Sequence, residues 1–221
     1  MIVIIIAINV LLSVIAFSRP EIKSALLFNP YAVKHQNQWW RVVTHAFIHA
    51  DFIHLFFNMY VLFAFGSNIE MIFTESSYFQ SYFPEIPFWG AARGLFYLFA
   101  LYLGGILFAT LPGFKKNSEN PGYNSLGASG AVSAIVFAYI VLMPTTKMGI
   151  IFLPGVAIPS FLMGVLYLFY EAYMDKRGGT YIAHDAHFWG AIFGAVFIFA
   201  INLKFLANFI FSISDYVKSF L

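Results

Sequence analysis

GASGAVSAIVFAYIVLM, residues 127–143, is the stretch that decides the fold. After Gly127 and Ser129 it continues without a charged residue to Met143. It contains one of six apolar runs, separated by polar residues, glycine or proline, that predict membrane-spanning helices over residues 2–17, 52–69, 92–111, 128–143, 149–173 and 184–203. A helix needs about 20 residues to cross a bilayer. The runs are continuous rather than alternating, which excludes a transmembrane barrel of strands.

Composition assigns the chain to the membrane proteins. Hydrophobic residues make up 61% of the 221 residues and charged residues only 10%, whereas soluble domains carry about 25% charged residues. We therefore expect an all-α membrane protein with six transmembrane helices, in one domain over residues 1–221 without a separate soluble domain. The first run lacks a basic region and a cleavage site, so we expect a retained helix rather than a signal peptide.

The charge and the missing cysteines exclude other classes. A net charge of +2 from scattered basic residues gives no indication of nucleic acid binding. Without cysteine, disulfides and thiolate nucleophiles are excluded. Six histidines could suggest zinc, but the HExxH pattern is missing, so we expect neither a metal nor a cofactor.

Ser129 stands where the fourth predicted span begins, between Gly127-Ala128 and Gly130. A serine there is most often a helix cap. The position also suits a nucleophile, because the first turn of a helix has unpaired N–H groups that can hold a developing oxyanion.

Two further groups of polar residues enter the second and sixth spans. His54 and Asn58 are four residues apart and share a helical face; interhelical polar contacts are the alternative to a site. His187, Gly190 and Gly194 share a face of the last span, and the two glycines predict close packing against Gly130, Ser133 and Ala134. Asp185 should point away from His187, as a loop-facing or capping group.

Together these motifs resemble the rhomboid family of intramembrane serine proteases. The matches are Trp40-Arg41, the block from His45 and His49 through His54 to Asn58, Gly127-Ala128-Ser129-Gly130, and His187 with Gly190 and Gly194. They occur in the order and spacing of the family.

The resemblance implies a six-helix bundle and a role for each matching residue. Ser129 would be the nucleophile and His187 the general base and acid. His54, Asn58, Ala128 and the Ser129 N–H would bind the oxyanion and substrate. Support would come from Arg41, paired with Glu70, from Gly127, Gly130, Gly190 and Gly194, and from His45 and His49 as structural residues.

The implied function is an intramembrane serine endopeptidase that cleaves transmembrane protein substrates in the bilayer. The alternative is an inactive rhomboid-like binder of membrane proteins. One departure is Ser133, which stands where the family commonly places an aromatic ring on the catalytic histidine. We expect His187 to be either mobile or held by the Ser133 hydroxyl or a water instead.

Location and orientation are predicted from different arguments. The resemblance suggests a bacterial-type cell membrane. Eight of the twelve lysines and arginines lie on the side of the long first connection, which the positive-inside rule would place in the cytoplasm. The resemblance implies the reverse, with both termini cytoplasmic.

Overall fold

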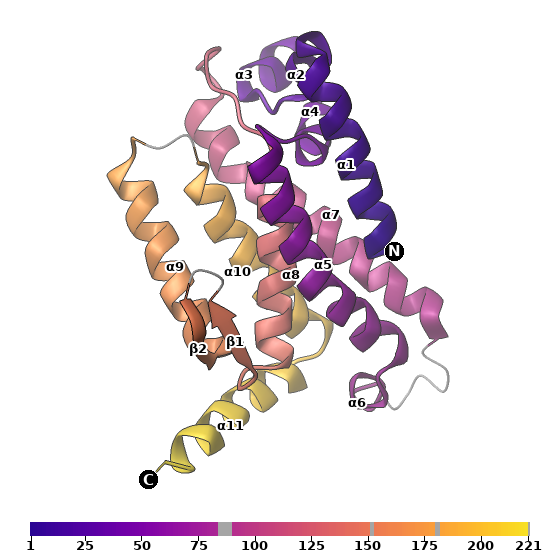
Figure 1. Ribbon diagram of the computed structural model, residues 1–221, viewed down its shortest axis with the longest axis vertical. Coiled ribbons are helices and arrows are strands. Elements are labelled where there is room, and N and C mark those ends of the chain that lie inside the picture. Colours follow the sequence, from indigo (N-terminus) through magenta and orange to yellow (C-terminus); the bar gives the residue numbers. More distant parts are fainter. Residues whose placement is uncertain (84–89, 151–152, 180–181, 221) are drawn as a thin grey trace.

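The computed structural model describes residues 1–83, 90–150, 153–179 and 182–220. The chain is mainly helical, with one two-stranded sheet among the described residues (Figure 1). The elements are α1 Ile2–Ser18, α2 Pro20–Leu26, α3 Pro30–Gln36, α4 Arg41–Thr44, η1 His45–Phe47, α5 Phe52–Glu75, α6 Ser77–Gln80, α7 Gly90–Asn117, α8 Ser129–Leu142, β1 Lys147–Ile150, β2 Leu153–Pro159, α9 Ser160–Arg177, α10 His184–Ile201 and α11 Lys204–Lys218.

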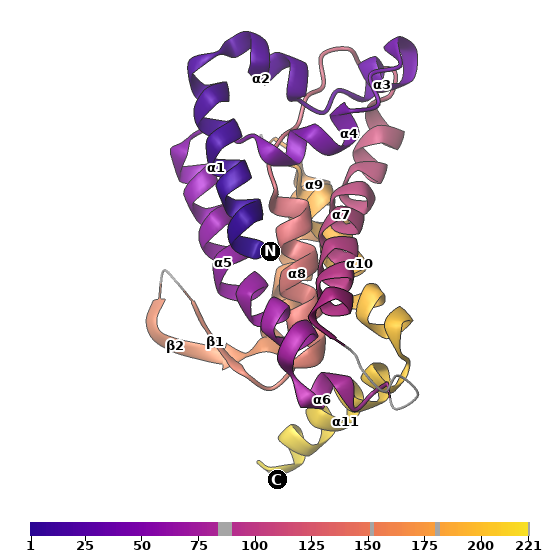
Figure 2. The same ribbon diagram turned by 90° about the vertical axis from the view of Figure 1, so that its right-hand side faces the viewer.

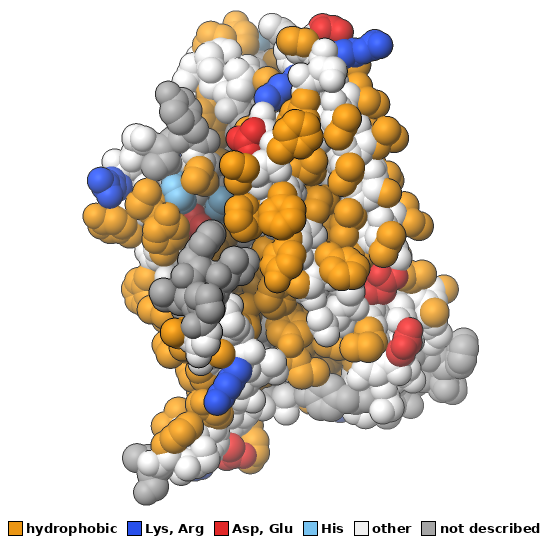
Figure 3. Space-filling view, in the orientation of Figure 1, with side chains coloured by type: hydrophobic (Ala, Val, Ile, Leu, Met, Phe, Trp, Pro, Cys, Tyr) orange, Lys and Arg blue, Asp and Glu red, His pale blue; other side chains and the backbone are white. Residues whose placement is uncertain are grey.

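Three helices in the described part of the chain are long and apolar enough to cross a membrane: α5, α7 and α10. Helices α1 and α8 are apolar but have only 17 and 14 residues. Hydrophobic side chains cover most of the face in Figure 3, and most charged side chains lie toward its two ends. This surface suits a lipid solvent, because a soluble protein would carry polar residues there.

Helix α8 lies at the centre of the bundle and is surrounded by α5, α7, α9 and α10 (Figures 1 and 2). Most of its side chains are buried, as expected for a helix that is apolar on all sides. Its most extensive contact is with α10.

Two glycines of α10 make that contact close. A Cβ atom added at Gly190 would lie 2.2 Å from the carbonyl oxygen of Gly130, and one added at Gly194 would lie 2.0 Å from that of Ala134. The predicted small-residue contact between the fourth and last spans is therefore present.

The long first connection is folded rather than extended. Helices α2, α3 and α4 lie at one end of the bundle, opposite α11 (Figure 2). A β-bridge between Phe28 and Ser125 ties this connection to the segment that leads into α8. The connection thus helps to fix the start of α8.

The fifth predicted span, residues 149–173, is wrong in its first part. Lys147–Ile150 and Leu153–Pro159 form the antiparallel strands β1 and β2, with Lys147 opposite Pro159, and helix α9 begins only at Ser160. Residues 151–152 lie outside the described residues. Proline ends a helix readily and Val and Ile favour strands, so this apolar run forms a hairpin first.

The C-terminal segment forms a helix of its own. Helix α10 ends at Ile201, and Lys204–Lys218 forms α11. Asn202 accepts a hydrogen bond from the Lys204 backbone N–H, which fixes the turn between the two helices.

Candidate active site

Ser129 and His187 meet at the start of α8. The Ser129 Oγ lies 2.7 Å from Nε2 of His187, which reaches it from the first turn of α10. Ser129 is the first residue of the helix, and the residue before it, Ala128, offers no side-chain cap. The hydroxyl is therefore bound to an imidazole rather than used as a helix cap.

A buried carboxylate stands behind the imidazole. Oε1 of Glu171, on α9, lies 3.2 Å from Nδ1 of His187. Its other oxygen, Oε2, lies 2.6 Å from Nδ1 of His184. Neither Glu171 nor His184 is among the site residues predicted from the sequence. The available signal was an ionisable residue within an apolar run, since residues 149–173 contain no other charged residue than Glu171.

His54 lies beside the same turn. The first turn of α5 is capped by Asp51, which accepts the His54 N–H at 2.8 Å. A Cβ atom on Gly127 would lie 2.9 Å from His54 Nε2, so the ring covers this glycine. Gly127 has φ +116°, a conformation that favours glycine over every other residue.

The hydrogen bonds of His54 and Asn58 leave donors for the site. Nδ1 of His54 accepts the Ala50 N–H at 3.4 Å, which places the ring hydrogen on Nε2. Asn58 donates to the His54 carbonyl at 2.9 Å, and its amide carries a second hydrogen. Both side chains can therefore donate a hydrogen bond.

A cavity of about 680 Å³ opens beside the serine. It lies between α5, α8 and α9, and its lining is mostly apolar, with Ser129, Asn58, His187 and Glu171 among its polar members. Figure 3 shows histidine side chains recessed among hydrophobic ones. A hydroxyl, an imidazole and an amide thus line the same apolar space.

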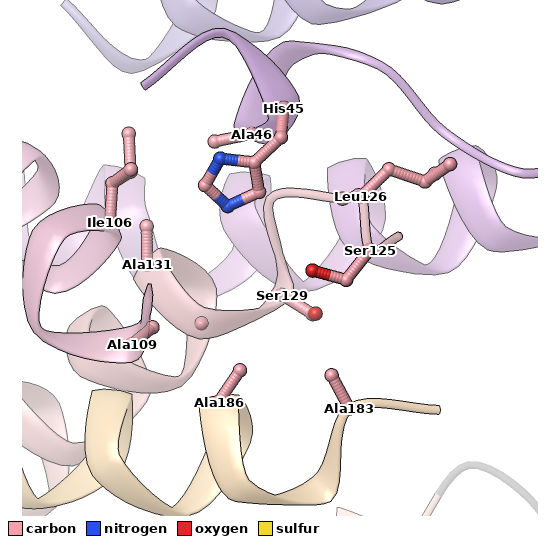
Figure 4. A pocket seen from close by; sticks show the side chains of 12 residues that line it. His45, Ala46, Ile106, Ala109, Ser125, Leu126, Ser129, Ala131, Ala183 and Ala186 are labelled. Carbon is pink, nitrogen blue, oxygen red and sulfur yellow. The ribbon is translucent and has the colours of Figure 1, made fainter. Parts of the chain in front are cut away.

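A second, smaller cavity of about 30 Å³ lies behind Ser129. Ala183 and Ala186 project from α10 toward the turn that carries Ser129, and His45 lies on the other side of that turn (Figure 4). Small side chains at these two positions let α10 approach the turn.

His45 and His49 connect the first connection to the bundle. Nδ1 of His45 is paired with the Arg41 carbonyl at 3.0 Å, and the His45 carbonyl accepts the Gly127 N–H at 2.9 Å. His49 Nδ1 lies 2.9 Å from Ser13 Oγ. Burial lowers the pKa of His45 to about 4, and burial together with His54 lowers the pKa of His49 to about 3. Both rings are neutral at pH 7.

Arg41 braces the first connection but does not pair with Glu70. Its guanidinium donates to the carbonyls of Ser24 and Leu27, at 2.7 and 2.8 Å, and to Gln38. The Glu70 carboxylate instead accepts the Ile2 N–H at 2.9 Å and pairs with the Met1 amino group. The suggested Arg41–Glu70 pair is therefore wrong. Arg41 begins the short helix α4, whereas Glu70 lies in the last part of α5.

Ser133 does not hold His187. Its Oγ lies 2.8 Å from the Tyr167 hydroxyl, because this face of α8 turns toward α9. Asp185 makes no contact with His187 either: it accepts the Ala186 N–H at 2.8 Å and pairs with Lys116 at 3.2 Å. Among the described residues, the group on His187 Nδ1 is Glu171.

Glu171, His184 and His187 are also the described residues that could hold a metal ion, with their ligand atoms within 4.8 Å of one another. A zinc ion prefers such imidazole and carboxylate ligands at about 2.0–2.2 Å. It would replace both carboxylate–imidazole hydrogen bonds.

Comparison with known proteins gives the family. The Rhomboid domain model matches residues 36–204. The chain belongs to the rhomboid family. Similar proteins are RHOMBOID-like protein 12, mitochondrial, from Arabidopsis thaliana (31% identical over 160 residues, 70% of this chain and 44% of the relative) and presenilin-associated rhomboid-like protein A, mitochondrial, from Danio rerio (29% over 159 residues, 71% and 36%).

The human presenilin-associated rhomboid-like protein, mitochondrial, is 27% identical over 162 residues, 69% of this rhomboid and 35% of the relative. The matched part is thus less than half the length of each of these relatives. These relatives are named as mitochondrial, so the comparisons do not support the bacterial-type cell membrane predicted above.

Proposed function

We propose that this rhomboid is a serine endopeptidase that cleaves transmembrane segments of membrane proteins, with Ser129 as nucleophile and His187 as general base and acid. The observation that carries the proposal is the 2.7 Å contact between Ser129 Oγ and His187 Nε2 on the wall of the large cavity. A hydroxyl needs an adjacent base to become a nucleophile, and this distance lies within the range for proton transfer.

The reaction is acyl transfer in two halves. Ser129 Oγ attacks the carbonyl carbon of the scissile bond while its proton passes to His187 Nε2. His187 then gives this proton to the leaving amine as the C–N bond breaks, leaving an ester on Ser129. A water molecule, deprotonated by His187, hydrolyses the ester and restores the hydroxyl.

The oxyanion of each tetrahedral intermediate needs donors. The Ser129 backbone N–H belongs to the first turn of α8, where N–H groups have no partner within the helix. The His54 Nε2–H and the second Asn58 hydrogen are the further side-chain donors in this proposal. Ala128 is the neighbouring residue in this turn, and its side chain is fully buried in the core.

The lining of the large cavity suits a transmembrane substrate. It is mostly apolar and includes Phe57, Tyr60 and Val132, beside Ser129. An apolar peptide that loses its helical hydrogen bonds locally could present a carbonyl there. We further propose that α1, α8 and α9 cross the bilayer together with α5, α7 and α10, as a six-helix bundle that works without a cofactor.

Labelling by a fluorophosphonate probe in detergent tests this proposal. The wild type should be labelled, whereas Ser129→Ala and His187→Ala should not. Ser133→Ala is the matched control, because it removes a serine hydroxyl one turn further along α8 that bonds Tyr167. Equal labelling of wild type and Ser129→Ala would refute Ser129 as nucleophile. A folded wild type that neither reacts nor cleaves would be the inactive binder.

A further inference from the structure

Glu171 is a buried acid in an apolar helix. Glu171 is only 3% exposed, and the apolar run around it, residues 149–173, contains no other charged side chain. Burying a carboxylate is costly unless hydrogen bonds and opposite charge compensate, so such residues in membrane helices are usually functional.

The two imidazole contacts of Glu171 determine where the imidazole hydrogens lie. An ionised carboxylate only accepts hydrogen bonds, so His184 and His187 each donate Nδ1–H to it. In the neutral ring, a hydrogen on Nδ1 leaves the lone pair on Nε2. For His187, that nitrogen faces the Ser129 hydroxyl at 2.7 Å.

We propose that Glu171 is the positioning residue of the Ser129–His187 pair, and that His184 holds it in place. The inference rests on the proposed function and adds a third member to a pair that the family resemblance predicts to act alone. Glu171 fixes the tautomer and the plane of His187, and its negative charge stabilises the imidazolium that forms during acyl transfer. It does not touch the substrate bond.

His184 has a distinct part in this arrangement. It is buried, and its short bond to Oε2 leaves Oε1 free for His187. Its Nε2 is buried and has no hydrogen-bond partner among the described residues. A bare nitrogen lone pair is tolerated there more easily than an N–H group, which agrees with a ring hydrogen on Nδ1 that is donated to Glu171.

The test compares Glu171→Gln with Glu171→Asp and with Asp175→Asn. Gln keeps the size but removes the charge, Asp keeps the charge on a shorter arm, and Asp175 is an acid one turn further on that pairs with Lys116. For a transmembrane substrate in detergent, kcat of Glu171→Gln should fall by about 10²- to 10⁴-fold with little change in KM. Glu171→Asp should recover part of kcat, and Asp175→Asn should match the wild type.

A purely structural role gives a different pattern. Loss of kcat would then follow the loss of thermal stability, and Glu171→Asp would recover nothing, which would overturn the proposal. If Glu171→Gln does not fold, Glu171→Asp and His184→Gln take its place, each with a kcat below that of the wild type. A fully active Glu171→Gln would also overturn it.

The result separates this inference from the proposed function. If Ser129→Ala is not labelled but Glu171→Gln keeps full kcat, the protein is a serine protease that uses only the Ser129–His187 pair, and the role of Glu171 is wrong. If Ser129→Ala is still labelled, the proposed protease mechanism is itself wrong. A change in wild-type kcat on adding a chelator would show that the three side chains bind a metal, and the positioning role would be wrong.

Discussion

Glu171 Oε1 lies 3.2 Å from Nδ1 of His187, whose other ring nitrogen lies 2.7 Å from the Ser129 hydroxyl. Three helices, α8, α9 and α10, each contribute one of these side chains. The imidazole is therefore held between an acid and a hydroxyl, and its orientation depends on how the three helices pack.

The proposed oxyanion donors should contribute unequally. Losing one such donor typically lowers kcat by about 10²- to 10³-fold. We expect His54→Ala and Asn58→Ala each to lower kcat, by less than this where the Ser129 N–H compensates. Steady-state kinetics on a helical substrate measures the effect, and Ser133→Ala serves as a control variant. Full activity in both single variants would make these side chains packing groups.

The contact between α10 and α8 should not tolerate a methyl group. A Cβ on Gly190 would lie 2.2 Å from the Gly130 carbonyl oxygen, so Gly190→Ala must push α10 outward and take His187 away from Ser129. We expect a loss of about 1–3 kcal/mol in stability and a parallel loss of cleavage. Thermal unfolding in detergent measures the first effect.

The control for this substitution is Gly149→Ala, because an added Cβ there meets nothing within 4 Å. It should unfold at the wild-type temperature. A Gly190→Ala protein that is as stable and as active as the wild type would show that α10 and α8 are further apart than the structure places them.

Acid should destabilise the fold through His45 and His49. Their folded-state pKa values are about 4 and about 3, against 6.5 for an exposed histidine, because both rings are buried. As pH falls below about 6.5, the unfolded chain binds protons that the folded chain does not, so stability decreases by up to about 1.4 kcal/mol per pH unit for each histidine. Above that pH these groups contribute no slope.

Unfolding temperatures measured from about pH 8 to about pH 4.5 test this linkage. A His45→Asn/His49→Asn variant should show a shallower decrease than the wild type, whatever its stability at pH 7. Identical slopes would show that other groups cause the acid sensitivity.

Orientation can be tested with single cysteines, since the chain has none. Lys23 lies at the end with α2–α4 and Lys218 at the opposite end, in α11 (Figure 2). We expect Lys23→Cys to react with an impermeant maleimide from outside intact cells and Lys218→Cys to react only after lysis. The reverse pattern would favour the charge rule over the family resemblance.

Spacing in the sequence can predict contacts between residues on one helix, or between two helix faces that are both lined by small residues. Gly190 and Gly194 share a face, so their contact with α8 was predictable, and with it the approach of His187 to Ser129. The contact of His187 with Glu171 on α9 was not predictable, because spacing along one helix does not give the rotation of another helix about its own axis. Glu171 was visible only as a charge in an apolar run.

The predictions for Ser133 and for the fifth span were wrong for related reasons. Ser133 lies one turn after Ser129, but the rotation of α8 directs its hydroxyl to Tyr167. Residues 147–159 are as apolar as a span, and hydrophobicity alone cannot distinguish a strand from a buried helix. The prolines and glycines at 149, 154, 155 and 159 were the better indication.

Cleavage of a single-span substrate in liposomes tests the central claim most directly. Mass spectrometry of the products should show one or a few cuts in or beside the transmembrane segment with the wild type. Ser129→Ala should give none, and Ser133→Ala should give the wild-type pattern. Cleavage at the same positions by Ser129→Ala, folded and reconstituted to the same level, would contradict the claim that Ser129 is the nucleophile of an intramembrane protease.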